Sequence, residues 1–325
     1  MRPPRVLSLL AAIATLACAL ALAACGGNND NKTKTSGTAT ANLIKKNPAN
    51  ANVAVKVGSK NFTEEFILGE IYAQALQAAG YKVSKDLNLG SEQIAFKALK
   101  ANQIDGYPEY TSTALTSFFG VKATDVPKDA KQAVSQAQGD FSKAGLVTFD
   151  PAPYESKNAV GMLKKKADQL GVKNVSDLKG KSQNLTLYGS PECRQRVDCL
   201  VGLEQDYGFK FKRFVPIDIG LRYQVLDKGQ ADLSIIFTSD PQLSTRKDIV
   251  TLADDKKVFP PGNPVFVARK AKVDQAGPDM QKTIQLVQGG LTLAVVRELN
   301  ARVDVDRQQP KQVARAYLKE SGYIK

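Results

Sequence analysis

The feature that most constrains the fold is the segment 53–71, VAVKVGSKNFTEEFILGEI. It begins with three valines that alternate with small or polar residues, which is the period of a half-buried strand. Turn-forming residues follow at 58–61, and apolar residues then recur at helical spacing until Gly80. A strand, a tight turn and a helix in this order open a βα unit. We expect Asn61 to cap this helix, with Glu64 completing a capping box.

The turn of this unit is a candidate anion site. In an open α/β sheet, ligands bind outside the carboxyl ends of the strands. The free backbone N–H groups and the dipole at the start of a helix favour an anion there, and Lys60 adds a positive charge. The turn therefore predicts contact with an anionic ligand group, although an ordinary βα turn with a solvated lysine explains the same residues.

The amino terminus predicts export. Residues 1–24 have the pattern of a secretory signal peptide, because two arginines precede an apolar run at 6–22. The sequence LAAC at 22–25 resembles a bacterial lipobox, which implies cleavage before Cys25 and a lipid on that cysteine; an uncleaved anchor is the alternative. Residues 25–52 contain few apolar side chains and predict a flexible tether. We expect an extracytoplasmic protein that is anchored to the bacterial cell membrane.

Composition argues against several other classes of protein. The sequence contains no histidine, which excludes Ser-His-Asp and Cys-His catalysis and His-ligated zinc. It also lacks a Walker loop, a GxSxG elbow and a GxGxxG motif. We therefore expect no enzymatic activity, no cofactor and no metal. The net charge of +13 could suggest nucleic acid, but the basic residues are spread over the chain and export removes that partner.

Two cysteines remain beyond the amino-terminal segment, Cys193 and Cys199. In an exported protein such a pair predicts a disulfide, and two buried thiols are the alternative. Six residues is an awkward spacing on one helix, so a bridge would require the segment to bend or break there.

The rest of the chain alternates between strand and helix patterns, which predicts an α/β fold. Proline-rich segments interrupt the alternation twice, at 150–154 and at 258–263. Two such crossings imply two lobes with a ligand cleft between them. The predicted first lobe comprises 53–152 and 259–325, and the predicted second lobe comprises 153–258.

The segment DGYPEYTST at 105–113 has a tyrosine on each side of Pro108, followed by hydroxyl residues. Proline donates no backbone hydrogen bond and is rarely found in a central strand. We therefore expect a rigid loop here that leads into a helix.

Five motifs, in order along the chain, resemble those of the substrate-binding proteins of osmoprotectant ABC importers. They are VGSKNFTEEFILGEI, IDGYPEYTSTAL, YGSPECRQRVDCLVGLEQDYGF, GLRYQVLDKGQADLSIIFTSDPQL and DDKKVFPPGNPVFVAR. The resemblance runs from about Val53 to the carboxyl terminus. It implies a two-lobed periplasmic-binding-protein fold of type II, the Venus flytrap. It also implies a receptor that binds glycine betaine, choline or carnitine and delivers it to a membrane permease driven by a cytoplasmic ATPase.

The resemblance also implies a set of ligand contacts. A quaternary ammonium has no N–H to donate and is held against aromatic ring faces, whereas the carboxylate of a betaine needs cationic donors. By similarity, Lys60 and Arg196 would hold the carboxylate from opposite lobes. Tyr110 would form one wall of the ammonium cage.

The remaining cage positions depart from the family pattern. Asn158 and Gly262 stand where many members have tyrosine, and Phe237 keeps the ring without the hydroxyl. The loss of two rings would weaken a trimethylammonium site by about ten- to a thousandfold. Three other tyrosines are candidates to refill the space: Tyr107, Tyr154 and Tyr223.

The leading hypothesis is therefore a lipid-anchored receptor for a small zwitterion or quaternary ammonium solute, with an intact anion-binding end and an altered cation-binding end. One alternative is a receptor of the same fold for another polar solute, such as an amino acid or a thiol-bearing betaine. Another is a surface lipoprotein that acts in adhesion or assembly without a small ligand.

Overall fold

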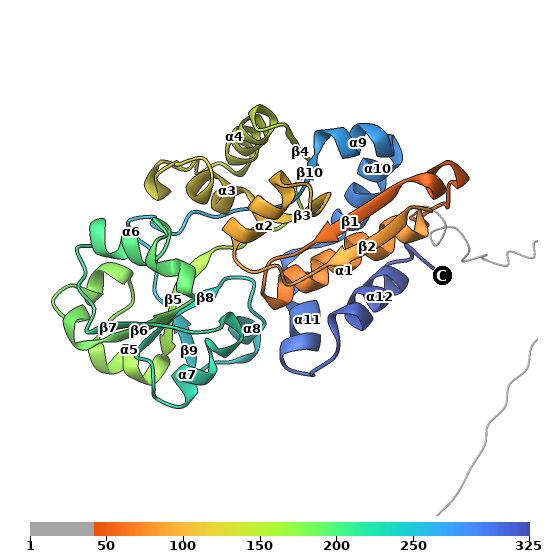
Figure 1. Cartoon of the computed structure of the whole chain (residues 1–325). Helices are drawn as coiled ribbons and strands as arrows, with labels where there is room; N and C mark the ends of the chain where they lie inside the picture. Colours follow the sequence, from red (N-terminus) through yellow and green to blue (C-terminus); the bar gives the residue numbers. More distant parts are fainter. Residues whose placement is uncertain (1–41) are drawn as a thin grey trace, which may run out of the picture. The chain divides into compact units, whose positions relative to one another are not determined.

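The structure, a computed structural model, describes residues 42–325 and folds them around two β-sheets (Figure 1). We call the part around the first sheet lobe 1 and the part around the second sheet lobe 2. Strands and helices alternate in both lobes, so the predicted α/β class is confirmed. The expected signal peptide at 1–24 and the expected lipidation site Cys25 lie outside the described residues. Among the residues that are described, no helix is both long and apolar enough to cross a membrane.

Lobe 1 contains a mixed sheet with the strand order β2-β1-β3-β10-β4. Its strands are β1 (Ala54–Gly58), β2 (Lys82–Asp86), β3 (Gly106–Tyr110), β4 (Leu146–Thr148) and β10 (Pro264–Arg269). Its helices are α1 (Thr63–Ala78), α2 (Glu92–Lys100), α3 (Thr111–Ser117), α4 (Ala130–Lys143), α9 (Lys270–Ala276), α10 (Pro278–Gln288), α11 (Leu293–Asp304) and α12 (Pro310–Glu320). Neighbouring residues of a strand point to opposite faces. Phe266 of β10 accordingly packs in the core with α1, α10 and α12, whereas Val267 packs in the core with α2, α3 and α4.

Lobe 2 contains a second mixed sheet with the strand order β7-β6-β8-β5-β9. Its strands are β5 (Asn158–Leu163), β6 (Thr186–Gly189), β7 (Arg213–Pro216), β8 (Leu233–Phe237) and β9 (Ile249–Thr251). Its helices are short: α5 (Lys164–Leu170), α6 (Leu200–Gln205), α7 (Gln224–Asp227) and α8 (Gln242–Thr245). Single 3-10 turns occur in both lobes at Pro48–Asn52, Ala123–Asp125, Val175–Leu178, Ser182–Asn184, Pro191–Arg194 and Ile219–Leu221. Ile235 and Ile236 of β8 fill the cores on opposite faces of this sheet.

The membership of the two sheets supports the predicted division of the chain. All strands of lobe 1 lie within 53–152 and 259–325, and all strands of lobe 2 lie within 153–258. The two crossings meet at Ser156 and Gly262, which form an antiparallel bridge with N–H to O distances of 3.0 and 3.2 Å. The chain therefore enters and leaves lobe 2 at neighbouring points, and the residue boundaries themselves stay a prediction.

The expectation of a loop at Pro108 is wrong, because this proline lies inside β3, between β1 and β10 in the sheet. Its position costs no ladder hydrogen bond. The N–H of Thr111 points toward β10, where it bonds to the oxygen of Asn263, and N–H groups alternate sides along a strand. The missing donor of Pro108 therefore faces the β1 side, and β1 pairs with β3 only through Val57 and Gly106. The sheet has no partner strand there to lose.

The expected capping box is also wrong. Helix α1 begins at Thr63, so Phe62 occupies the N-cap position and Asn61 precedes it. Glu64 turns inward instead and is buried. Its carboxylate accepts hydrogen bonds from Tyr110 Oη at 2.5 Å, from Tyr154 Oη at 2.8 Å and from Asn300 Nδ2 at 2.9 Å. These three tertiary bonds replace the local contact that the capping pattern predicts.

The predicted flexible tether at 25–52 ends earlier than expected, because its last part is bound to lobe 1. The N–H of Ile44 bonds to the oxygen of Tyr323 at 2.9 Å, and Asn50 is buried with its amide on the oxygen of Ala79 at 2.9 Å. Asn47 donates to Asp279 at 2.6 Å. The asparagines that suggested a polar linker therefore satisfy backbone and carboxylate groups of the folded domain. The part of the predicted tether before residue 42 lies outside the described residues.

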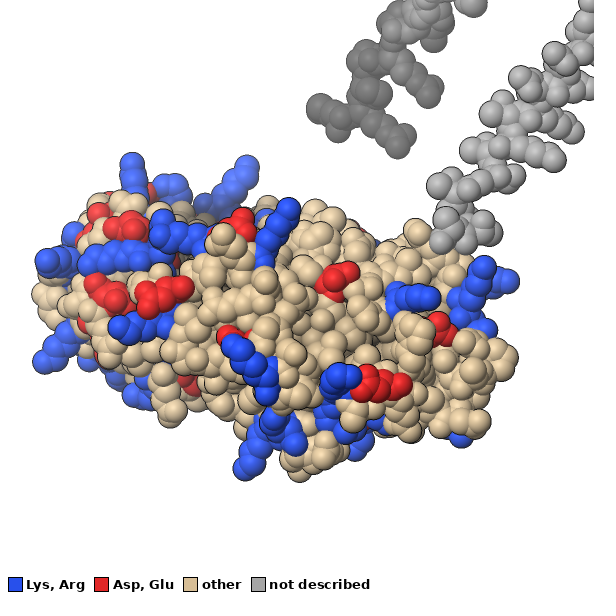
Figure 2. Space-filling model, turned by 90° about the horizontal axis from the view of Figure 1, so that it is seen from above, with Lys and Arg blue, Asp and Glu red and all other residues tan. Residues whose placement is uncertain are grey.

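The charged side chains of both signs are interspersed on the face shown in Figure 2. They are densest over the left end of that view, where lobe 2 lies, and the middle of the face is largely uncharged. The excess of basic residues thus forms no continuous basic groove on this face, and the absence of a nucleic-acid partner remains a prediction.

Candidate ligand-binding site

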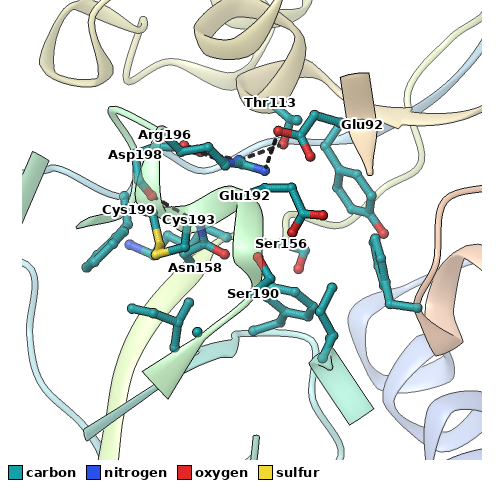
Figure 3. A pocket seen from close by; sticks show the side chains of 18 of the residues that line it. Glu92, Thr113, Ser156, Asn158, Ser190, Glu192, Cys193, Arg196, Asp198 and Cys199 are labelled. Atoms are coloured by element: carbon teal, nitrogen blue, oxygen red, sulfur yellow. Dashed lines mark hydrogen bonds and ion pairs between the residues drawn. A yellow bond between two sulfur atoms is a disulfide. The ribbon is translucent and has the colours of Figure 1, made fainter. Parts of the chain in front are cut away.

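A pocket lies between the two lobes and is lined by residues from both. Tyr110 ends β3 in lobe 1, while Gly189 ends β6 and Phe237 ends β8 in lobe 2, and all three line the pocket. The pocket thus lies at the carboxyl ends of strands of both sheets, where α/β folds usually bind ligands. Figure 3 shows the polar side chains of the lobe 2 loop that lines it.

Three aromatic rings meet in this pocket. The ring centroid of Phe62 lies 6.2 Å from that of Tyr110 and 5.4 Å from that of Phe237. Phe62 and Tyr110 come from lobe 1, and Phe237 comes from lobe 2. Sequence reasoning predicted Tyr110 and Phe237 but missed Phe62. An apolar residue directly after the Lys60–Asn61 turn, at the N-cap of α1, was the available signal.

Lys60 lines the pocket but is already paired within lobe 1. It is only 3% exposed, and its ammonium forms an ion pair with Glu109 and lies 3.5 Å from Glu65 Oε1. Its backbone N–H donates to Glu65 Oε2 at 3.0 Å. Burial alone would lower the pKa of Lys60, but the charges of Glu109 and Glu65 outweigh it and raise the pKa. Protein carboxylates therefore fill the place where the turn predicted a ligand anion.

Glu65 is the most perturbed carboxyl of this cluster. Its pKa is raised from 4.5 to about 8, chiefly by burial, while the charge of Lys60 lowers it and the charge of Glu109 raises it. A pKa of about 8 means that Glu65 keeps its proton at neutral pH. The ammonium of Lys60 also lies 4.6 Å from the ring centroid of Tyr110, on which it makes a cation–π contact.

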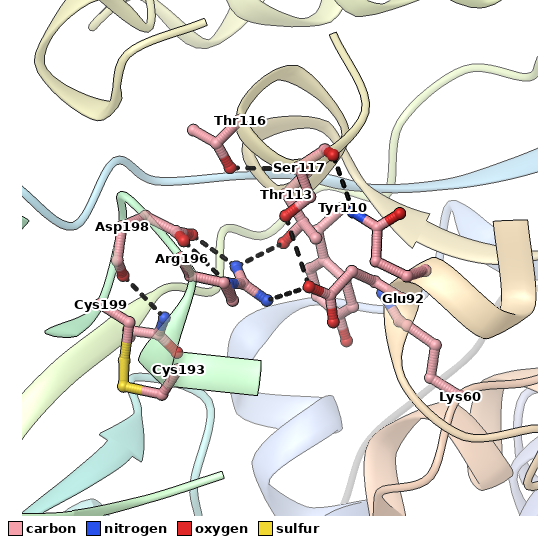
Figure 4. Close-up of polar contacts among 12 residues, drawn as sticks. Lys60, Glu92, Tyr110, Thr113, Thr116, Ser117, Cys193, Arg196, Asp198 and Cys199 are labelled. Atoms are coloured by element: carbon pink, nitrogen blue, oxygen red, sulfur yellow. Dashed lines mark hydrogen bonds and ion pairs between the residues drawn. A yellow bond between two sulfur atoms is a disulfide. The ribbon is translucent and has the colours of Figure 1, made fainter. Parts of the chain in front are cut away.

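Arg196 reaches across the cleft from lobe 2. Its guanidinium forms two hydrogen bonds to Asp198, at 2.7 and 2.5 Å, which is the bidentate geometry that arginine favours with carboxylates. It also lies 3.5 Å from the carboxylate of Glu92 and 3.4 Å from the hydroxyl of Thr113, both in lobe 1 (Figure 4). Burial alone would lower the pKa of Arg196, but Asp198 and Glu92 raise it. Arg196 of lobe 2 therefore links the two lobes through the side chains of Glu92 and Thr113.

The predicted disulfide is present between Cys193 and Cys199, whose Cα atoms are 5.2 Å apart. The segment breaks between them as expected, since one 3-10 turn ends at Arg194 and α6 begins at Leu200. The bridge closes the short loop that carries Arg196 and Asp198 (Figure 4). It therefore limits the positions that the guanidinium can reach.

Of the other residues predicted to contact the ligand, Asn158 lies in the pocket lining and Gly262 does not. Asn158 lines the pocket and donates to the backbone oxygen of Asp198 at 3.0 Å. Gly262 is outside the lining and lies in the crossing, where an added Cβ would stand 2.2 Å from Ser112 Oγ. The three tyrosines proposed as replacements also lie outside the lining, with their hydroxyls bonded to carboxylates at 2.8 to 2.9 Å: Tyr107 to Glu109, Tyr154 to Glu64 and Tyr223 to Asp240.

Sequence reasoning missed a further cation, Arg222. It lines the pocket, pairs with Asp240 and lies 5.0 Å from the ring centroid of Phe237. Burial alone would lower the pKa of Arg222, and the charge of Asp240 raises it. Its partner lies 18 residues away in sequence, after β8, so no local pattern announces the pair.

Comparisons with known proteins agree with this architecture. A family model described as "Substrate binding domain of ABC-type glycine betaine transport system" matches residues 53–320. The chain is 32% identical over 293 residues to the "Glycine-betaine-binding protein" of Pseudomonas aeruginosa, which covers 87% of this chain and 92% of that protein. It is 26% identical over 283 residues to the "Ergothioneine transport permease/ergothioneine binding protein EgtU" of Helicobacter pylori, which covers 86% of this chain and 50% of that protein. A crystal structure of a glycine betaine/carnitine/choline ABC transporter superposes with a TM-score of 0.63 at 27% identity, covering 82% of this chain and 98% of that chain.

Proposed function

The chain belongs to the family of substrate-binding domains of ABC-type glycine betaine transport systems, and from this premise we propose that it binds a small quaternary ammonium solute between its lobes. Glycine betaine, carnitine and choline appear in the names of similar proteins and define the ligand class. The receptor delivers the solute to a membrane permease and its ATPase, and it catalyses no reaction. It works outside the cytoplasmic membrane, held there by a lipid on Cys25.

The main support for this ligand class is the group of three aromatic rings contributed by both lobes: Phe62, Tyr110 and Phe237. A quaternary ammonium presents only methyl groups with a diffuse positive charge, and ring faces attract it without any hydrogen bond. Phe62 supplies a ring in a pocket where Asn158 takes a position that is tyrosine in many members of the family. Rings from both lobes also explain why ligand would favour the closed state, since closure completes the cage.

The interlobe contacts supply the closing device. Arg196 bridges to Glu92 and Thr113 at one side of the pocket. Arg297 of α11 donates to the oxygen of Thr238 at 2.7 Å on lobe 2. Contacts of this kind hold two lobes together when ligand is bound and release them by a hinge motion. The paired crossings at Ser156 are the natural hinge.

Calorimetric titration with glycine betaine, choline, carnitine and proline betaine tests the proposal. We expect saturable heat with at least one of them. Phe62→Leu removes a ring and keeps apolar bulk, so it should weaken that ligand by about two- to thirtyfold, the range of one cation–π contact. Phe211→Leu is the matched control, because Phe211 packs with Phe209 in lobe 2 outside the pocket and should leave affinity unchanged.

A protein that gives no heat with any of these four solutes would refute them as its ligands. A second candidate is then a thiol-bearing betaine, which the name of the Helicobacter pylori relative favours. Native mass spectrometry of the purified protein distinguishes the two, since a retained solute would reveal its mass directly.

A further inference from the structure

We infer that the pocket selects a small quaternary ammonium cation without a carboxylate, of the choline class, over a zwitterionic betaine, and that Glu192 is the residue that makes this selection. The inference rests on the proposed function and narrows its ligand class. It reverses the expectation from sequence, which placed an intact carboxylate-binding end in the pocket.

The first argument is that the two cations expected to bind a ligand carboxylate are already neutralised. Lys60 is paired with Glu109, and its backbone N–H is taken by Glu65. Arg196 donates two hydrogen bonds to Asp198 and lies beside Glu92. A ligand carboxylate would have to displace these protein carboxylates, and each displaced one would then be left in a buried site without its partner. That cost opposes binding of a betaine.

The second argument is the balance of charge around the pocket. Four cations line it: Lys60, Lys157, Arg196 and Arg222. Three carboxylates line it: Glu92, Glu192 and Asp198. Three more carboxylates are direct ion partners of the lining cations: Glu65, Glu109 and Asp240. With Glu65 protonated, as at neutral pH, the pocket thus has one more negative than positive charge. A ligand with a net positive charge balances this excess, whereas a zwitterion does not.

The third argument is the position of Glu192. It lies on the 3-10 turn Pro191–Arg194 and is half-buried, and Figure 3 shows its carboxylate pointing into the pocket near Ser156. Among residues 42–325, its side chain forms no hydrogen bond or ion pair with another residue. The neighbouring Cys193 fixes this turn through the disulfide. Glu192 therefore presents a held, uncompensated negative charge to whatever occupies the pocket.

The physical consequence is that the Glu192 carboxylate attracts the ammonium of either ligand and repels the carboxylate that only a betaine carries. An ammonium held in the pocket is attracted by the Glu192 carboxylate, and a charge pair at the rim of a protein cleft is only partly screened by water. The carboxylate of a betaine adds a repulsion of similar size. We expect choline to bind about tenfold more tightly than glycine betaine, with the difference shrinking as salt rises.

The test compares choline and glycine betaine by calorimetric titration on the wild-type protein and on Glu192→Gln. The substitution keeps the size of the side chain and removes its charge. It should weaken choline about tenfold and leave glycine betaine unchanged or tighter. Glu204→Gln is the matched control: Glu204 is exposed on α6 outside the pocket, and its loss should change neither affinity. Raising the salt concentration should weaken choline more in the wild type than in Glu192→Gln, which gives a second reading on the intact protein.

Wild-type protein that binds glycine betaine as tightly as choline would overturn the inference and leave the proposed receptor function standing. Equal effects of Glu192→Gln on the two ligands would show that Glu192 does not discriminate between them, and would also overturn it. Failure of the wild type to bind any quaternary ammonium would refute the proposed function itself, and the inference with it.

Discussion

The buried carboxyl of Glu65 makes the stability of the protein depend on pH in an unusual direction. Glu65 is fully buried beside Lys60 and Glu109, and burial raises its pKa from 4.5 to about 8. In the unfolded chain the same carboxyl loses its proton near its ordinary pKa of 4.5. Between these two values the folded state therefore holds one more proton than the unfolded state, so stability falls as pH rises. Glu65→Gln replaces the protonated acid with a neutral side chain of the same shape and removes the titration.

The size of the effect follows from proton linkage. One extra proton in the folded state costs about 1.4 kcal/mol of unfolding free energy for each pH unit of increase. Over the window from the ordinary pKa of 4.5 to about 8, the total is at most about 5 kcal/mol. We expect Glu65→Gln to match the wild type near the lower end of this window. The variant should become the more stable protein as the pH approaches the upper end, because only the wild type must then ionise a buried acid.

The measurement is urea unfolding between about pH 5 and 9, followed by circular dichroism and tyrosine fluorescence. The quantity of interest is the difference in unfolding free energy between variant and wild type at each pH, since titrations shared by both proteins cancel. Glu204→Gln, at an exposed position, should give a flat difference. If Glu65→Gln is instead less stable than the wild type at the upper end of the range, Glu65 is ionised in the folded state and forms a charged pair with Lys60, and the reasoning fails.

Two further predictions concern the crossing and the disulfide loop. Gly262→Ala places a Cβ 2.2 Å from Ser112 Oγ, so it should lower the unfolding free energy by about 1–3 kcal/mol and weaken ligand binding; Gly139→Ala, where nothing lies within 4 Å, should not destabilise. Thermal unfolding of the two variants compares them directly, and equal melting temperatures would contradict the crowding argument. Replacing Cys193 and Cys199 by serine opens a short loop and should cost roughly 2 kcal/mol. A double variant with unchanged urea midpoint and unchanged ligand affinity would show that the disulfide neither stabilises the fold nor positions the loop for ligand binding.

Local patterns predicted the elements of this fold well where periodicity and turn residues agreed. The unit around Lys60 is a strand, a turn and a helix as expected, and the segment between Cys193 and Cys199 breaks as the bridge requires. The prediction at Pro108 was wrong because β3 can contain a proline only if β1 ends before it. The pairing of two strands cannot be read from the sequence of either strand alone. The position of Phe62 was missed for a related reason, since a capping pattern explained its surroundings without it.

The electrostatics of the site could be predicted least. Lys60 was identified as a pocket residue, but its partner Glu109 is 49 positions away. Arg196 was identified as a clamp, but Glu92 reaches it from the other lobe. The sequence shows which residues carry charge but leaves open which distant ones meet, as Lys60 meets Glu109 and Arg222 meets Asp240. An inventory of cations therefore overestimates the capacity of a pocket for an anion.

The bridge between Ser156 and Gly262 holds the two ends of the second lobe beside each other. A segment whose two ends are neighbours can be exchanged between related chains by joining the backbone at only two adjacent places. Chimaeras that keep the first lobe and import 153–258 from a relative would carry a new half of the cage and a new loop with its own charges. Solute preference could then be recombined without redesigning the half of the molecule that continues to the chain's end.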